Sequence, residues 1–355
     1  MPAAASQPPV LRATESPSRL KSVLAGIALL GLAALLYLER AKLHFDWHTL
    51  LVQARLASLP KILLGVACIY LGYWLRSLRW SLLLAPVKRV SAISLLPWQV
   101  IGFTIVGLFG RLTDMSRPIL IARRTKTPVV TQLAIYSIER AFDIGSAAAL
   151  FSLTLALAPN SMPHHEAFAR AGVASLAGTL FLAIIALSLR FRGEQVARLS
   201  ERLIATFSAK LAKTVAARLL DFRDGLQAIS TIFEFLYVAA LSLLMWVGIA
   251  AAYLCCTHAF VACPPLAGLS IAGIMLLMAT SLGGSLLQLP VIGWFTQMAV
   301  LAAALHGFFA VPLEVATACG AVLQIVMNLS VVPLGLIFAQ VTGTGLRATA
   351  HDTPA

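Results

Sequence analysis

The chain has 355 residues, of which 59% are hydrophobic and 12% charged, and its mean hydropathy is +0.88. A soluble domain is about 45–50% apolar and about 25% charged, so this composition excludes an ordinary water-soluble protein. Long continuous apolar runs favour helices over a barrel, and we predict an all-α, polytopic transmembrane helix bundle. The net charge of +13 then belongs to cytoplasmic loops and faces anionic lipid headgroups, and no nucleic-acid partner is expected.

The chain begins with a Pro-, Ala- and Ser-rich tail at 1–21, which is predicted to be disordered and cytoplasmic. A transmembrane domain is expected over 22–340, followed by a second disordered tail at 341–355. Its first span, at 23–38, follows basic residues but lacks a small-residue cleavage site, which indicates an uncleaved span rather than a signal peptide. About eight spans are expected in all, the others at 61–85, 129–158, 171–189, 235–259, 266–286, 291–311 and 315–339.

The segment 95–110 is apolar but only about sixteen residues long, which is marginal for a span. Pro97, Gly102, Gly107 and Gly110 punctuate it, so a re-entrant or broken segment is predicted, covered by protein or lining a cavity. If it does not cross, both termini are cytoplasmic. If it crosses, the N-terminus lies outside.

The longest polar stretch, 190–231, carries apolar residues at every fourth position and basic residues on the other face. This pattern predicts one or two amphipathic cytoplasmic helices. Such helices either lie on the membrane surface or form a solvated cap on the bundle, and the sequence leaves both open.

Lys and Arg set the orientation. They gather in 88–126 and again in 190–223, whereas the 159–170 loop has one. The two basic regions are therefore predicted to face the cytoplasm, in a multi-pass protein of the inner (cytoplasmic) cell membrane.

Three ionisable side chains lie in the middle of the 129–158 span: Glu139, Arg140 and Asp143. At ~1.5 Å per residue they are ~16–22 Å into the helix, near the bilayer centre, where one charge costs about 2.5–3.5 kcal/mol on insertion scales. The two carboxylates share a helix face, and a second cation is expected from Arg111 or Arg117. The cluster is either a functional site or a structural network that joins helices.

The loop 110–118 contains Arg111, Asp114 and Arg117 beside a glycine and a proline. Arginine binds phosphate through two parallel hydrogen bonds, so this loop is a candidate site for a lipid phosphate or diphosphate. An ordinary basic cytoplasmic loop is the alternative.

A second interruption lies at 281–297, where glycines, a proline and amides break an apolar stretch. Interrupted segments in both halves of a chain are typical of a transporter's binding region, and a tight loop between two spans is the alternative. The candidate residues here are Gln288, Pro290, Gly293 and Gln297.

These motifs together resemble a flippase-like family, that of the transmembrane region of lysylphosphatidylglycerol synthase. Arg111-Leu112-Thr113-Asp114-x-x-Arg117 is similar to its basic loop, Glu139-Arg140-Ala141-Phe142-Asp143 matches its intramembrane motif, and Pro290-Val291-Ile292-Gly293 weakly matches its C-terminal break. The resemblance covers about 20–340. It implies movement of a lipid headgroup between leaflets, by a stand-alone member without the C-terminal aminoacyl-transferase domain.

The function expected from this resemblance is a lipid flippase or transporter for a polar headgroup, phosphate-bearing or of polyprenyl or hopanoid type. One alternative is a non-transporting scaffold of a lipid or glycan biosynthesis pathway, with a biosynthetic enzyme as its partner. The other is an intramembrane transferase acting on a lipid carrier. The sequence has no His-Glu-x-x-His, Gly-x-Ser-x-Gly or Asp-x-Asp motif, and its five cysteines lack metal-ligand spacing. We therefore expect no enzyme and no metal or other cofactor.

Overall fold

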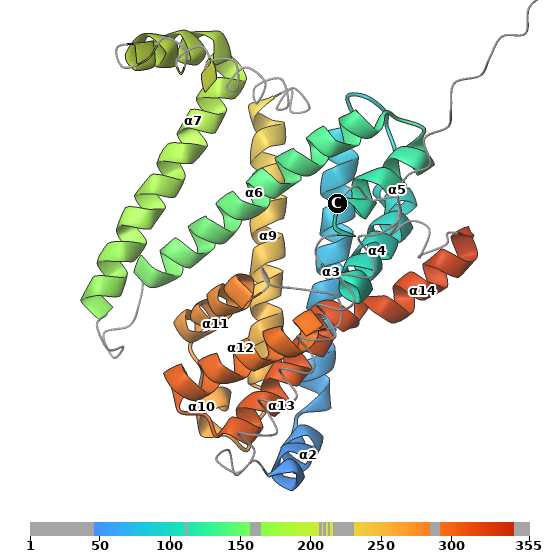
Figure 1. The fold of residues 1–355 in the computed structure, drawn as a ribbon, viewed down its shortest axis with the longest axis vertical. Helices are drawn as coiled ribbons and strands as arrows, with labels where there is room; N and C mark the ends of the chain where they lie inside the picture. Colours follow the sequence, from blue (N-terminus) through green and yellow to red (C-terminus); the bar gives the residue numbers. More distant parts are fainter. Residues whose placement is uncertain are drawn as a thin grey trace, which may run out of the picture. The chain divides into compact units, whose positions relative to one another are not determined.

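The computed structural model describes residues 46–110, 113–156, 165–205, 208, 211, 214–215, 231–284 and 292–343. Within these ranges every regular element is a helix, which confirms the all-α prediction (Figure 1). The predicted first span at 23–38 and the tail at 1–21 lie outside the described residues, as does most of the tail at 341–355. The helices are α2 (Trp47–Leu56), α3 (Leu59–Leu84), α4 (Ala92–Phe109), α5 (Ser116–Thr125), α6 (Val129–Ala156), α7 (His165–Ala205), α9 (Ile232–Thr257), α10 (Pro264–Ala267), α11 (Ile271–Gly284), α12 (Ile292–Phe309), α13 (Leu313–Gln324), the π-helical turn η4 (Ile325–Leu329) and α14 (Val331–Thr342).

Four helical runs in the described part are long and apolar enough to cross a membrane. They are α3, α4, α9 and the continuous run Leu313–Thr342 that joins α13, η4 and α14. Helix α6 has 28 residues and carries the three mid-helix charges, whereas α11 is apolar but shorter. Large apolar side chains such as Leu63, Ile144 and Leu244 are exposed, as expected where a helix faces lipid rather than water.

Helices α3 and α9 run side by side through the centre of Figure 1, and α6 crosses them obliquely. Helix α4 packs between α3 and α14, and α5 connects it to α6. The largest buried apolar cluster joins α3 and α9 to the C-terminal helices, with Tyr73, Cys256 and Leu323 among its members. A smaller cluster around Trp80 and Leu95 packs α3 and α4 against α6. The charged residues of α3 and α6 therefore lie between helices that are packed against one another.

The prediction that 95–110 is broken is wrong, because α4 is one continuous helix from Ala92 to Phe109. That the segment re-enters the membrane without crossing stays a prediction. Its glycines mark close approaches rather than breaks. A Cβ on Gly102 would overlap Arg117 of α5, and one on Gly107 would lie 3.0 Å from the Asn328 carbonyl oxygen of η4. The helix ends only at Gly110, where φ is +88°. The prediction that both termini are cytoplasmic assumed that this segment does not cross, and it stays a prediction.

The C-terminal segments are more interrupted than the sequence indicates. The predicted span at 266–286 divides into the short α10 and α11, which begins only at Ile271. The predicted span at 315–339 contains the π-helical turn η4, where the Ser330 N–H bonds to the Ile325 carbonyl at 2.7 Å. The second predicted break falls between α11 and α12, and its residues 285–291 lie outside the described part.

Helix α7 includes the predicted 171–189 span and continues into the first part of the predicted amphipathic stretch. Non-helical backbone at Arg192 divides it into two pieces. On the second piece, Leu199 and Leu203 are exposed rather than packed on the bundle. Whether this helix lies on the membrane surface or forms a solvated cap stays open.

Candidate functional site

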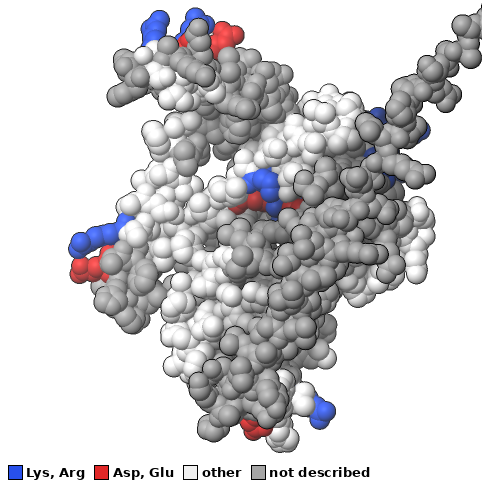
Figure 2. All heavy atoms as spheres, in the orientation of Figure 1, with Lys and Arg blue, Asp and Glu red and all other residues white. Residues whose placement is uncertain are grey.

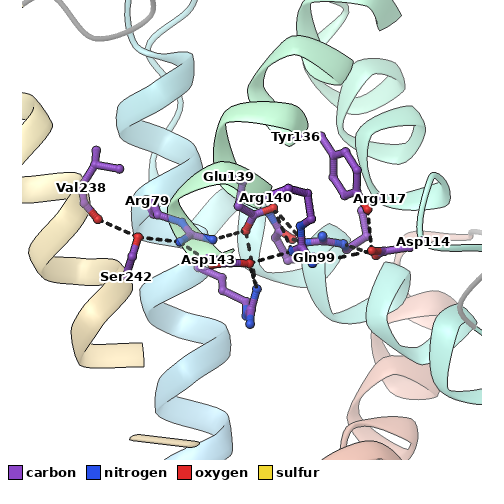
Figure 3. Close-up of polar contacts among 11 residues, drawn as sticks. Arg79, Gln99, Asp114, Arg117, Tyr136, Glu139, Arg140, Asp143, Val238 and Ser242 are labelled. Atoms are coloured by element: carbon purple, nitrogen blue, oxygen red, sulfur yellow. Dashed lines mark hydrogen bonds and ion pairs between the residues drawn. The ribbon is translucent and has the colours of Figure 1, made fainter. Parts of the chain in front are cut away.

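Arg79 of α3 is the centre of a buried ionic network (Figure 3). Its Nη2 lies 2.7 Å from Glu139 Oε1, and its Nη1 lies 2.7 Å from Asp143 Oδ1. Nη1 also donates to Ser242 Oγ of α9 at 2.6 Å. One guanidinium thus connects both carboxylates of α6 with the neighbouring helix α9.

Arg117 of α5 supplies a second buried cation, as the sequence predicts. Its Nη1 donates to Glu139 Oε2 at 3.2 Å, and its Nε donates to Asp114 Oδ1 at 2.9 Å. The guanidinium also lies 4.4 Å from the ring centroid of Phe103, a cation–π contact that holds it against α4. Arg111, the other candidate cation, lies outside the described residues.

Arg140 borders the network on its exposed side. Its Nη2 lies 3.0 Å from Asp143 Oδ2, and its Nη1 lies 3.9 Å from Asp114 Oδ2. Asp114 also accepts a hydrogen bond from the Tyr136 hydroxyl at 2.6 Å. Asp114 is in the turn between α4 and α5, outside the spanning helices. Burial raises the pKa of its carboxyl, but the guanidiniums of Arg117 and Arg140 outweigh burial and hold that pKa below its usual range.

Five of the six residues predicted for the lipid path are therefore in one network: Asp114, Arg117, Glu139, Arg140 and Asp143. The sequence interpretation did not include Arg76 and Arg79, which lie within the predicted 61–85 span. Arg76 Nη1 lies 3.3 Å from Asp143 Oδ2. Both arginines lie near the end of the predicted 61–85 span, where basic residues are common, so the sequence marks neither of them as a site residue.

The described network has an excess of positive charge. Four guanidiniums (Arg76, Arg79, Arg117 and Arg140) face three carboxylates (Asp114, Glu139 and Asp143), which leaves one positive charge unmatched. Several N–H donors are buried there without a hydrogen-bond partner among the described residues: Arg79 Nε, Gln99 Nε2, Arg117 Nη2 and Arg140 Nε. The arrangement can accept a ligand that is negative and rich in acceptors.

The network is not sealed inside the protein. The side chains of Arg79 and Arg117 are fully buried, but that of Arg140 is 31% exposed and that of Arg76 is 14% exposed. Figure 2 shows basic and acidic atoms meeting in the middle of a face that is otherwise uncharged in the described residues, away from the charges at the edges of the view. A ligand can therefore reach the network through its arginine border.

The second predicted break is only partly described, since Gln288 and Pro290 lie outside the described residues. Gly293 is buried near the start of α12. Gln297 is buried one turn further on, and its Nε2 donates to Ser281 Oγ of α11 at 2.9 Å. In the described part, Gln297 therefore bonds an uncharged hydroxyl group and is not part of the arginine network.

The described residues contain no group of three or more His, Cys, Asp or Glu side chains that is placed to hold a metal ion. The carboxylates of the network face guanidiniums instead. Its chemistry in the described part is therefore that of ion pairs and hydrogen bonds.

The chain matches the family described as the lysylphosphatidylglycerol synthase TM region over residues 23–335. It belongs to this family. The match contains the whole ionic network and both predicted interruptions, so the protein is a multi-pass membrane protein of a family tied to lipid-related processes. Comparison with curated protein sequences and with solved structures finds no match.

Proposed function

We propose that this protein moves a lipid with a polar, phosphate-bearing headgroup between the two leaflets of the membrane. The observation that carries the proposal is the buried network of four arginines and three carboxylates, which has an unmatched positive charge and borders the surface at Arg140. Ionised groups in hydrocarbon are expensive and mark substrate paths in membrane proteins. A network that only joined helices would be more stable with equal numbers of positive and negative charges.

The chemistry of the network favours a phosphate-bearing headgroup over an uncharged hopanoid-type one. A phosphate oxygen accepts from guanidinium N–H groups in the same way that Glu139 and Asp143 do. It can therefore exchange with a carboxylate as the partner of Arg140 or Arg76 without leaving either charge unpaired. Such exchange gives the headgroup a path through the membrane that avoids a bare charge in hydrocarbon.

The same proposal places the protein in the inner membrane as a multi-pass carrier that is not an enzyme, with both termini cytoplasmic. A biosynthetic enzyme that delivers or receives the lipid is its proposed partner. The basic stretches at 88–126 and 190–223 support the orientation, since Lys and Arg are retained on the cytoplasmic side.

The test is reconstitution of the purified chain in vesicles with a panel of fluorescent lipids, scored by how fast each label reaches the other leaflet. At least one phosphate-bearing lipid is expected to cross faster with protein than without. If every lipid crosses at the protein-free rate, the proposal fails and the result favours the scaffold alternative. Formation of a new lipid product from a radiolabelled donor would instead favour the transferase alternative.

A further inference from the structure

A second buried polar cluster lies where α9, α11 and α12 meet, and it contains no charge. The hydroxyl of Tyr253 donates to Ser281 Oγ at 2.8 Å, and Gln297 Nε2 donates to the same oxygen at 2.9 Å. All three side chains are at least nine-tenths buried. Such hydroxyl and amide groups hydrogen-bond helices to one another in membranes, and here they join three helices at one point.

One face of α9 connects this cluster to the arginine network. Ser242, Trp246 and Tyr253 are four and seven residues apart, so they share a helix face. Ser242 accepts from Arg79, and Tyr253 bonds Ser281. At 1.5 Å per residue the two ends of this face are about 16 Å apart, roughly half the thickness of the hydrocarbon layer.

The cluster has unused capacity to donate as well as to accept. Gln297 Oε1 is a buried acceptor with no partner among the described residues, and Trp246 Nε1 is a buried donor with none. Ser281 Oγ already accepts two hydrogen bonds, which leaves its own proton to donate. In contrast, the unpartnered nitrogens of the arginine network are all donors. Buried polar atoms left unpaired lower stability, so they indicate that something else pairs with them.

We propose that Tyr253, Ser281 and Gln297 form a second headgroup site that binds an uncharged hydroxyl group, with the Trp246 indole two turns away on the same face of α9. A hydroxyl both donates and accepts, which matches Gln297 Oε1 and the Ser281 proton, and the cluster offers no cation to hold a phosphate. The inference rests on the proposed function. It adds that the headgroup meets a charged site at one level of α9 and a hydroxyl-binding site about three turns away.

The experiment compares two fluorescent lipids with the same tails and the same single negative charge, phosphatidylglycerol and phosphatidylpropanol, which lacks the two headgroup hydroxyls. Each is followed in vesicles containing wild type, Gln297→Met, Tyr253→Phe or Gln324→Met. Gln324 is the control, since it is a buried amide on α13 that bonds Asn328 of the same helical run; its own Nε2 has no described partner, so it also tests whether any buried unpaired amide gives the effect. Melting temperatures in detergent confirm that each variant folds.

Wild type is expected to move phosphatidylglycerol roughly three- to tenfold faster than phosphatidylpropanol, the range expected for one net hydrogen bond. Gln297→Met should abolish the rate difference between the two lipids by slowing phosphatidylglycerol alone. Tyr253→Phe should reduce that rate difference, and Gln324→Met should leave it unchanged. If Gln297→Met does not fold, an unchanged difference in Tyr253→Phe overturns the inference.

Two further outcomes separate this inference from the proposed function. Equal wild-type rates for the two lipids, or a Gln297→Met variant that slows both alike, would mean that water satisfies the cluster and that it is structural. Either result overturns the second site while lipid movement stands. If wild type moves neither lipid faster than protein-free vesicles, the proposed function fails and the second site fails with it.

Discussion

Arg79 of α3 and Glu139 of α6 are bonded at 2.7 Å between Nη2 and Oε1, and neither side chain is more than 1% exposed. They are 60 residues apart in the chain. The bond fixes the level at which α3 crosses α6, and Arg117 approaches the other oxygen of Glu139 from α5. A single carboxylate therefore aligns three helices around the partly exposed side chain of Arg140.

Arg79→Gln is predicted to destabilise the protein strongly. The change leaves Glu139 and Asp143 without their shortest ion pairs in a buried site, and removing one partner of a buried pair costs about 3–5 kcal/mol. The expected result is a large fall in the detergent melting temperature. Arg170→Gln is the control, because Arg170 pairs with Glu166 but is 82% exposed, and an exposed pair contributes about 0–1 kcal/mol. Equal small shifts in both variants would contradict a buried, energetically coupled network.

Gly102→Ala is predicted to displace Arg117. The new methyl group would overlap Arg117 Cγ and lie 3.2 Å from Arg117 Cα, so α4 and α5 must separate at a cost of about 1–3 kcal/mol. Gly72→Ala is the matched control, since a Cβ there has nothing within 4 Å and alanine favours a helix by up to about 1 kcal/mol. The melting temperature should fall in the first variant and hold or rise in the second. A Gly102→Ala protein with wild-type stability and lipid movement would refute this close approach.

Asp114 is predicted to stabilise the fold in a pH-dependent way. Its pKa is lower in the folded protein than in the unfolded chain, so its contribution is full above the unfolded value of about 4 and is lost as the pH falls through the folded value. The difference in melting temperature between wild type and Asp114→Asn should therefore be constant from about pH 5 upward and shrink below about pH 4. A difference that disappears between pH 6 and pH 8 would show that another group is responsible.

Headgroup charge is predicted to govern the rate of movement. The unmatched positive charge of the network attracts an anionic phosphodiester and repels a cationic headgroup. Fluorescent lipids with the same tails should therefore cross in the order anionic, uncharged, cationic. The two extremes are expected to differ by about tenfold or more, which corresponds to about 1.4 kcal/mol. The reverse order, measured in vesicles of neutral lipid, would contradict the prediction that the unmatched positive charge of the network governs the rate.

The membrane class could be predicted from the composition, and the centre of the site could be predicted from the position of two carboxylates. Glu139 and Asp143 interrupt an apolar run where a charge is expensive, so their position alone marks them. Arg76 and Arg79 carry no such mark, because basic residues near the end of a span are normal and their long side chains usually reach the interface. Only the packing of α3 against α6 shows that Arg79 points inward.

The helix at 92–109 shows the opposite error. Pro97 and three glycines read as breaks, yet the segment is a regular helix. Gly102 and Gly107 are required because Arg117 and the Asn328 carbonyl come within contact distance of them. These neighbours are 15 and 221 residues away in the chain, so no local pattern distinguishes a glycine that breaks a helix from one that admits a neighbour.

The most direct test of the account is the initial rate at which an anionic phosphodiester lipid changes leaflet in vesicles containing wild type, Arg140→Gln or Arg124→Gln at equal protein density. Both arginines are at least partly exposed and both variants lose one positive charge, but only Arg140 borders the network. We predict that Arg140→Gln slows the lipid about tenfold, which corresponds to about 1.4 kcal/mol, while Arg124→Gln keeps the wild-type rate. If both variants melt normally and both move the lipid at the wild-type rate, the network does not handle the headgroup.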